Sequence, residues 1–331
     1  MGIRIGMLHR RTAVVAAAVV SALIAPGAAV AVGASTAQLP VACSSSRDPA
    51  LAARMSRDIR AALSSRQGTV SLAVHDDDTG LTCALAGTRQ YDSASIVKVM
   101  IMEAVLRRAE QLGRGLTRWE LANIRPMITR SDNTAARRLW TNLGHVSLAR
   151  FLTRAGTSGT ALGPGGYWGL TRTTAADQLR LLDVLTRTGS FLRATSRAYG
   201  LKLLNQVRSD QRWGVPAGMP RDLRAHVKNG WLPRSTHGWR VHSVGAFTGP
   251  HRTYRIVVLS HDNPTMAYGV RTIERIAQAV HRGLNRGADH GRGTARGLTP
   301  EHEISEKPDG SAPYWPPPGR PEPEPGSGAT P

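Results

Sequence analysis

The chain has 331 residues, and its 43 Lys and Arg against 23 Asp and Glu give a formal net charge of +20 at pH 7. The arginines are spread over the whole sequence, and aromatic residues make up only 5% of it. This pattern argues against a nucleic-acid-binding protein, because such proteins carry basic residues and stacking aromatic residues clustered on one surface. A basic exported protein would instead be attracted electrostatically to anionic cell-wall polymers.

The first residues have the pattern of a secretory signal peptide. Three arginines precede an apolar run over 12–25, and an Ala-x-Ala cleavage pattern follows at 29–31. The apolar run is too short and too rich in alanine for a membrane span. We therefore expect residues 1–31 to be a leader for general secretion, with twin-arginine export through Arg10-Arg11 as the alternative.

Cys43 and Cys83 are the two cysteines of the chain, and both follow the leader. In an oxidising exterior they are expected to form a disulfide between the N-terminal segment and the first hairpin. The alternative is a lipid anchor on Cys43, although Pro40 breaks the usual lipidation pattern. The expected location is therefore extracellular and associated with the cell wall.

The elements of the globular part follow one another in an informative order. In chain order, the patterns predict a helix from Asp48-Pro49 to about Leu63, strands at 69–75 and 81–85, a long helical region over 95–189, strands at 226–228, 239–247 and 253–260, and an amphipathic helix over 270–284.

This order predicts one α/β (α+β) domain over residues 40–286. Two strands, a helical middle and three more strands imply a five-stranded antiparallel sheet flanked by terminal helices, plus an all-helical lobe. A functional site is expected in the cleft between sheet and lobe. Residues 287–331 are rich in Gly and Pro and are predicted to be a disordered tail or spacer.

Ser95 and Lys98 stand three residues apart at the start of a strongly apolar stretch. On a helix this spacing puts both side chains on one face, so the Lys98 amine could reach Ser95 Oγ. A desolvated lysine can act as the base that a serine nucleophile needs. The alternative is a structural lysine one turn after a capping serine. Only four residues of the chain are lysines, and an unpartnered lysine in this apolar setting would be costly.

Two further motifs follow the first one. Ser-Asp-Asn at 131–133 lies between two helical patterns, where it could simply be a helix cap. Lys-Asn-Gly at 228–230 lies on the first strand after the helical region. A glycine there would let a substrate backbone approach the strand closely, whereas a lysine on an edge strand is by itself unremarkable.

With Ser-x-x-Lys, Ser-Asp-Asn and Lys-x-Gly in this order, the chain resembles the superfamily of class A β-lactamases and penicillin-binding serine hydrolases over about 48–284. The resemblance implies that Ser95 is the nucleophile that forms an acyl-enzyme and that Lys98 is its base or proton relay. It implies that Ser131 passes a proton to the leaving nitrogen. Lys228 would tune that serine and attract a substrate carboxylate.

The resemblance also implies which residues hold the substrate. Asn133 would bind the substrate amide and orient the catalytic lysine. The oxyanion hole would consist of the backbone N–H groups of Ser95 and Trp231, with Gly230 beside them. Asn229 stands where threonine or serine is usual in the family, which removes a hydroxyl contact to the substrate carboxylate.

The sequence departs from the family at the residue that releases the acyl group. Family β-lactamases carry a glutamate in the loop after the Ser-Asp-Asn helix, but no Asp or Glu occurs here between Asp132 and Asp177. Asp177 has the pattern of a helix-start charge. His145 and Tyr167 are the other groups with proton-transfer chemistry in this window, and each is more often structural. We therefore expect weak or absent β-lactam turnover.

These observations predict an exported, monomeric serine hydrolase acting on a small-molecule or cell-wall peptide amide or ester. The alternatives are a non-catalytic penicillin- or muropeptide-binding module and a basic wall-associated scaffold.

Arg234 or Arg240 could assist with a substrate carboxylate or be ordinary surface arginines. We expect no cofactor, no nucleic acid and no metal, because His226, His237 and His242 lack the spacing and carboxylate partners of a zinc site.

Overall fold

The computed structural model describes residue 2 and residues 40–250, 252–285 and 297–312. The predicted leader lies outside the described residues. In the described part of the chain, we find no helix that combines the length and the apolar character needed to cross a membrane.

The centre of the fold is an antiparallel sheet of six strands in the spatial order β1-β3-β2-β8-β7-β6. These strands are β1 (Ala42–Ser44), β2 (Thr69–Asp76), β3 (Thr82–Leu85), β6 (Arg224–Pro233), β7 (Trp239–Gly249) and β8 (Arg252–Asn263). The short strands β4 (Tyr91–Asp92) and β5 (Arg172–Thr173) pair separately. The predicted fold class is confirmed, but the predicted count of five strands in the main sheet is wrong.

The sixth strand, β1, is too short for an alternating pattern to reveal it. It pairs with β3 so that Cys43 stands opposite Cys83, and the two form a disulfide. This confirms the predicted disulfide. Because a sulfur in a disulfide cannot also carry a thioether-linked lipid, the structure favours the disulfide over the lipid anchor. The disulfide secures a strand that three residues of pairing would hold only weakly.

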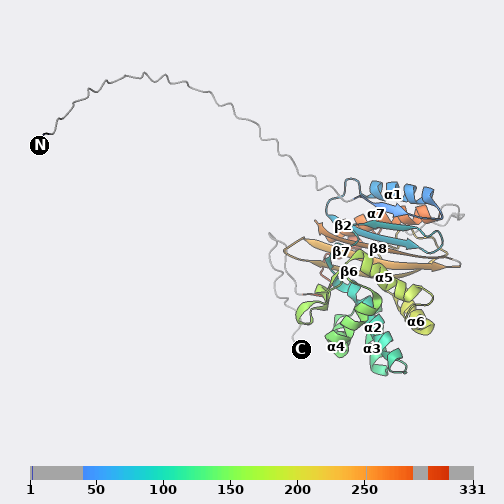
Figure 1. Ribbon diagram of the computed structural model, residues 1–331, viewed down its shortest axis with the longest axis vertical. Helices are drawn as coiled ribbons and strands as arrows, with labels where there is room; N and C mark the ends of the chain where they lie inside the picture. Colours follow the sequence, from blue (N-terminus) through green and yellow to red (C-terminus); the bar gives the residue numbers. More distant parts are fainter. Residues whose placement is uncertain (1, 3–39, 251, 286–296, 313–331) are drawn as a thin grey trace, which may run out of the picture. The chain divides into compact units, whose positions relative to one another are not determined.

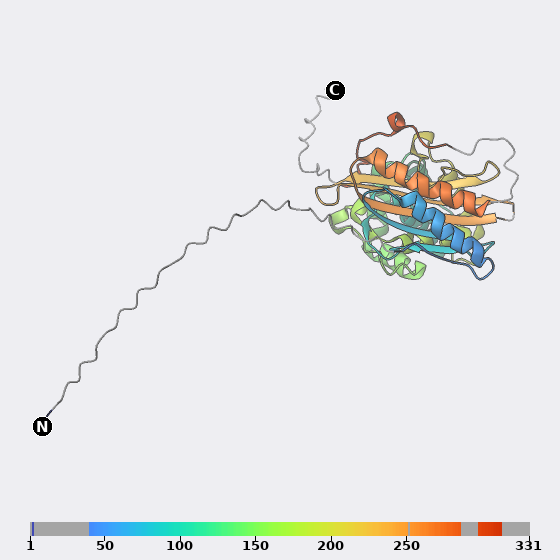
Figure 2. The same ribbon diagram turned by 90° about the horizontal axis from the view of Figure 1, so that it is seen from above.

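Helices α1 (Pro49–Leu63) and α7 (Met266–Leu284) cover one face of the sheet and run side by side over it (Figures 1 and 2). Asp48 caps α1 by accepting a hydrogen bond from Leu51 N, and Pro49 opens the helix, as the sequence predicts. The two helices cross closely at Gly283, where a Cβ atom would lie only 2.5 Å from Met55 Cε.

The opposite face carries the helical lobe (Figure 1). Its helices are α2 (Lys98–Gln111), α3 (Arg118–Thr129), α4 (Asn133–Ala155), α5 (Ala175–Thr186) and α6 (Ala194–Asn205). The predicted helical region is therefore several helices with identifiable breaks. Thr117 and Glu120 form a capping box that starts α3, and Gly144 kinks α4 with a φ of 73°.

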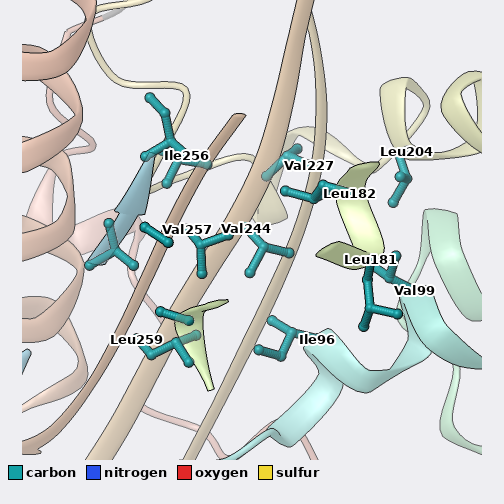
Figure 3. Close-up of a cluster of buried hydrophobic side chains, with 14 of the residues drawn as sticks. Ile96, Val99, Leu181, Leu182, Leu204, Val227, Val244, Ile256, Val257 and Leu259 are labelled. Carbon is teal, nitrogen blue, oxygen red and sulfur yellow. The ribbon is translucent and has the colours of Figure 1, made fainter. Parts of the chain in front are cut away.

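Apolar side chains next to the Ser95–Lys98 motif pack the helical lobe against the sheet. Figure 3 shows side chains from the start of α2, from α5 and from strands β6, β7 and β8 in one buried cluster. The cluster includes Ile96, Val99, Leu181, Leu182, Val227, Val244 and Val257. Since Ile96 directly follows Ser95, this packing fixes the serine relative to the sheet.

Residues 297–312 lie against the domain, whereas the sequence composition predicts a disordered tail after residue 287. Glu274 on α7 accepts hydrogen bonds from the backbone N–H and the hydroxyl of Thr299. Ile304 is buried in the core, and the Glu306 carboxylate accepts from Met266 N at the start of α7. A few specific contacts therefore hold a segment whose composition alone would not fold.

We expect loss of the disulfide to destabilise the protein through the unfolded state. Cys43 and Cys83 are 40 residues apart, and closing a loop of that length contributes about 3–4 kcal/mol in the chain-entropy model. Replacing both cysteines by serine should lower the free energy of unfolding by about that amount in urea denaturation. An unchanged midpoint and slope would show that the disulfide contributes nothing to stability.

Candidate active site

Ser95 lies in a short 3-10 turn, η1 (Ala94–Val97), which leads directly into α2. The serine is fully buried, and the preceding Ala94 has a φ of 47°, in the left-handed region that non-glycine residues seldom adopt. Strain of this kind tends to persist where the surrounding structure needs a side chain in one particular place. Here it places Ser95 one turn before the amine of Lys98.

The Lys98 amine is surrounded by four oxygen atoms. Its Nζ lies 2.8 Å from Ser95 Oγ, 2.7 Å from Ser131 O, 3.0 Å from Ser131 Oγ and 2.7 Å from Asn133 Oδ1. Two of these atoms, the Ser131 carbonyl and the Asn133 amide oxygen, can only accept hydrogen bonds. A neutral amine that donates its two N–H groups to them keeps its lone pair for a hydroxyl proton.

The surroundings of Lys98 favour this neutral form. Burial and, secondarily, the nearby Lys228 ammonium hold the pKa of Lys98 well below its usual value, against the opposing effect of Asp309 and Asp132. A lysine with a depressed pKa is a competent base at neutral pH. The geometry therefore provides the contact that activation of Ser95 requires, and the lowered pKa favours the neutral amine.

Ser131 lies in the connection between α3 and α4, with a φ of 57°. Its hydroxyl is 3.0 Å from both Lys98 Nζ and Lys228 Nζ, so it bridges the two amines. Asp132 caps α4 by accepting from Ala135 N. The helix-cap interpretation therefore holds for Asp132, and the neighbouring Ser131 and Asn133 both contact Lys98.

Lys228 projects from β6 toward the same hydroxyl. It is buried, its Nζ also donates to Asn229 O at 2.7 Å, and burial lowers its pKa to about 8, against the opposing charge of Asp309. Below that pH the amine is an ammonium. Two lysines thus share one serine hydroxyl: the pKa of the first is well below its usual value, and the second is charged at neutral pH.

Gly230 brings strand β6 against the nucleophile. An added Cβ at this position would lie 2.6 Å from Ser95 N and 2.8 Å from Ile96 N, closer than real Cβ atoms approach backbone. Trp231 follows it on the same strand, so the two N–H groups predicted to form the oxyanion hole come from neighbouring backbones. Glycine is therefore required here by the close approach of two chains.

Asn229 is oriented differently from the other predicted substrate-binding residues. Its side-chain amide donates to Gln211 O at 3.0 Å and to Trp213 O at 2.9 Å, and the residue is fully buried. Both N–H groups are thus used to hold the 211–213 loop. Only Oδ1, which has no hydrogen-bond partner among the described residues, remains for a ligand.

The loop that carries a glutamate in the family presents an aromatic ring instead. Trp168, in η3 (Trp168–Leu170), is buried, and its ring centroid lies 4.7 Å from Lys98 Nζ. The sequence does not indicate Trp168, because an aromatic residue in a loop carries no catalytic signal.

The other candidate proton-transfer groups of this window lie in different surroundings. Tyr167 is 46% exposed, and the Asp177 carboxylate accepts a hydrogen bond from Thr160 Oγ1. His145 lines a separate cavity beside Leu152 and Thr157.

Arg234 and Arg240 both contact Asp92. Arg240 is buried and lies 3.0 Å from a carboxylate oxygen of Asp92, and Arg234 lies 3.6 Å from the same atom. This ion-paired arrangement gives the two arginines a structural role. Lys98 and Lys228 are the basic residues that contact Ser131.

The three histidines weighed as metal ligands do not meet at one point. Buried His242 contacts Asp92 O, and His226 contacts Leu201 O. His237 instead joins His261 and Asp262 in the one group among the described residues with ligand atoms close enough for a metal. Both histidines of this group hydrogen-bond the carboxylate, a pairing that needs no metal.

Asp309, from the C-terminal segment, reaches the nucleophile. Its Oδ2 accepts a hydrogen bond from Ser95 N at 2.9 Å, and its backbone carbonyl accepts from Asn133 Nδ2 at 2.8 Å. Lys-Pro-Asp-Gly in a Pro- and Gly-rich tail has the pattern of an exposed turn, so the sequence does not indicate that Asp309 belongs to the site. The tertiary structure alone brings it to Ser95.

Comparisons with known proteins agree with this fold. The solved structures with similar folds include a single-residue mutant of an ancestral Gram-negative class A β-lactamase (23% identity, TM-score 0.59, covering 70% of this chain and 99% of that one). They also include the β-lactamase from Sphaerobacter thermophilus (22%, TM-score 0.60, 71% and 98%) and a single-residue mutant of PBP-A (18%, TM-score 0.60, 71% and 97%). The molecule therefore has the fold of the class A β-lactamases and penicillin-binding proteins.

The sequence matches agree with the structural ones. The profile described as "Beta-lactamase enzyme family" matches residues 54–118 and 111–284, and the chain belongs to this family. A curated relative from Mycobacterium tuberculosis, named "Putative lipoprotein LppW", is 29% identical over 199 residues, which cover 58% of this chain and 63% of the relative. The same relationship holds for LppW of Mycobacterium bovis.

We expect Gly230→Ala to disable the site while leaving the fold intact. The new methyl group would push β6 away from Ser95 by a substantial fraction of an ångström, and misplacements of about 1 Å cost on the order of 10²-fold in rate. The measurement is the rate of Ser95 acylation by a penicillin, compared with Gly115→Ala, where a Cβ meets open space. Equal rates for the two variants would contradict the close approach.

Proposed function

We propose that the protein is an exported serine hydrolase that forms an acyl-enzyme at Ser95 from an amide or ester. The observation that carries the proposal is the 2.8 Å contact between the buried Lys98 amine and Ser95 Oγ. Nucleophilic catalysis needs a base next to the attacking serine and N–H groups that face the reacting carbonyl. Lys98 is buried, has a lowered pKa and contacts Ser95, and the backbone N–H groups of Ser95 and Trp231 lie beside it.

In the proposed acylation, Lys98 takes the proton from Ser95 Oγ as that oxygen attacks the carbonyl carbon. The negative charge that develops on the carbonyl oxygen is stabilised by the N–H groups of Ser95 and Trp231. As the tetrahedral intermediate collapses, the Ser131 hydroxyl gives its proton to the leaving nitrogen. The lysines on either side of Ser131, 3.0 Å from its Oγ, return the proton to it.

The second half of the reaction is expected to be slow. Release of the acyl group needs a base that activates water, but the 163–170 loop has no carboxylate and places the Trp168 ring 4.7 Å from Lys98 Nζ. An indole ring cannot accept a proton at neutral pH. We therefore propose that β-lactams are trapped as a persistent Ser95 adduct.

The substrate class proposed is a small molecule or a peptide-like component of the cell wall. Lys228, charged at neutral pH, would attract a carboxylate. The PBP-A mutant is described as an acyl-enzyme complex with penicillin G, which supports β-lactams as probes. The net charge of +20 favours anionic wall polymers as a secondary partner. We propose that the protein acts as a monomer.

An extracellular or cell-envelope location is supported by two observations. The described cysteines form a disulfide, which persists in oxidising compartments, and the mycobacterial relative is named a lipoprotein. The predicted leader is consistent with export. We propose secretion with retention at the wall.

A non-catalytic module that binds penicillin or muropeptides is the second candidate function. The observation that favours it is Asp309, which occupies the N–H of Ser95 in this structure. Such a module would bind ligands without forming a covalent bond to Ser95.

Intact-mass measurement over several hours with benzylpenicillin decides between the two functions. We expect one adduct per chain that persists after the free drug is removed, because the loop lacks a base. Ser95→Ala should lose the adduct, and Lys98→Met should slow its formation by about 10²–10⁴-fold. The matched control is Ser93→Ala, a neighbouring buried serine that hydrogen-bonds only backbone carbonyls. An unmodified chain, or rapid hydrolysis without an adduct, would contradict the proposal.

The pH dependence of acylation should report the charge of Lys228. Since a lysine is charged below its pKa, Lys228 is an ammonium at pH 7 and loses that charge above about pH 8. The rate constant with benzylpenicillin should therefore fall above about pH 8, whereas a penicillin methyl ester, which has no carboxylate, should not show this fall. Lys228→Arg should shift the decline to higher pH, since arginine stays charged. Identical profiles for the two probes would exclude Lys228 as the carboxylate site.

A further inference from the structure

The C-terminal segment is anchored at a distance from the nucleophile before it enters the cleft. Thr299 bonds to Glu274, Ile304 is buried, and the Glu306 carboxylate receives N–H groups from Met266 and Ala267 at the start of α7. These contacts end at Glu306. Residues 307–311 then continue over the site itself.

This part of the chain lies along the outer edge of β6. Strand β6 is the last strand of the sheet, so one side of its backbone is available for pairing. Asp309 N donates to Trp231 O at 3.2 Å, and Trp231 Nε1 donates to Lys307 O at 2.7 Å. An extended peptide that adds to an exposed sheet edge is a common mode of peptide recognition.

Asp309 makes the contacts that a reacting substrate would need. Its carboxylate oxygen accepts from Ser95 N, the donor assigned to the developing oxyanion, and its carbonyl accepts from Asn133 Nδ2, the group assigned to the substrate amide. The other carboxylate oxygen accepts from Ser311 N at 2.8 Å, which keeps the side chain turned toward the serine. A carboxylate oxygen thus occupies one of the two donors assigned to the tetrahedral oxygen.

The charge of Asp309 also opposes catalysis. It raises the pKa values of both Lys98 and Lys228, in opposition to burial. An ammonium at position 98 has no lone pair for the Ser95 proton. The segment therefore blocks an oxyanion donor and lowers the fraction of Lys98 that is free to accept the Ser95 proton.

Two glycines make this fit possible. Gly310 has a φ of 71°, and a Cβ there would lie 2.8 Å from Asn133 Nδ2. Gly169, on the opposite loop, faces Ser311, and a Cβ there would lie 2.3 Å from Ser311 O. The segment and the loop are complementary in shape because both lack a side chain at the contact.

From these contacts we infer that the cleft is a binding site for a peptide segment that presents a carboxylate to Ser95, and that residues 307–311 occupy it as an intramolecular pseudosubstrate. The inference rests on the proposed function only in assigning Ser95 as the nucleophile. The bound segment is unreactive because a carboxylate, rather than an acyl carbon with a leaving group, faces Ser95. A substrate gains access when the segment leaves.

The test compares acylation rates among four forms of the protein, using a fluorescent penicillin. These forms are the unchanged chain, a chain that ends at Glu306, Asp309→Asn and Gly310→Ala. The truncation keeps Thr299, Ile304 and Glu306, so it preserves the anchors. We expect the acylation rate constant to rise at least tenfold on truncation, and to rise less in the two single variants.

The matched control is Glu303→Gln, which removes one negative charge from the same segment at an exposed position. It should acylate at the rate of the unchanged chain. If all five forms react at one rate, or if truncation slows the reaction, the pseudosubstrate is excluded. A rise in Glu303→Gln equal to that in Asp309→Asn would also exclude it, because the effect would then be one of net charge.

A binding measurement separates this inference from the proposed function. A synthetic peptide of residues 307–312, with blocked ends, is titrated calorimetrically into the chain that ends at Glu306. We expect saturable binding at millimolar peptide, weaker than in the intact chain because the linkage is lost. The peptide with Asp309→Asn should bind less well.

The acylation measurement and the peptide-binding measurement can contradict their proposals independently of each other. If none of the chains is acylated but the peptide binds with the expected dependence on Asp309, the enzyme proposal is wrong and the peptide site stands. If the chains are acylated but the peptide does not bind and truncation has no effect, the enzyme proposal stands and the pseudosubstrate is wrong.

Discussion

The buried amine of Lys98 is the group on which the arrangement of the site depends. An amine taken out of water must be given acceptors or lose its proton, and here both occur. The oxygen atoms of Ser131 and Asn133 surround it, and its pKa is depressed. This requirement accounts for the left-handed backbone at Ser131, because only a sharply turned connection between α3 and α4 presents both the carbonyl and the hydroxyl to one amine.

The balance of charge in the cleft follows from the same constraint. Lys98 and Lys228 face one serine hydroxyl, and the loop that supplies a carboxylate in related enzymes supplies Trp168 instead. Negative charge near the amines comes from Asp132 and from Asp309, which lies far along the chain. The residue that balances the charge is thus also the residue that occupies the N–H of Ser95. The electrostatics of the site and its access to ligands are coupled.

Much of the fold was predictable because its elements carry strong local signals. The Asp48 cap, the alternating strand at 69–75 and the stripe of α7 each predict their element without tertiary information. The predicted strand count was wrong because β1 has three residues and depends on its disulfide. The order at 297–312 was not predicted, because it depends on contacts such as Glu306 with the start of α7, to which composition is blind.

The sequence by itself determined the family and the residue types of the candidate site: a serine and a lysine three residues apart, two further motifs, and no carboxylate between Asp132 and Asp177. These are properties of residue type and spacing, which local geometry converts directly into position. Only the tertiary structure decided where Asn229 points, which ring covers Lys98 and what lies against Ser95. Those contacts join segments separated by tens to hundreds of residues, and packing of the whole domain selects them.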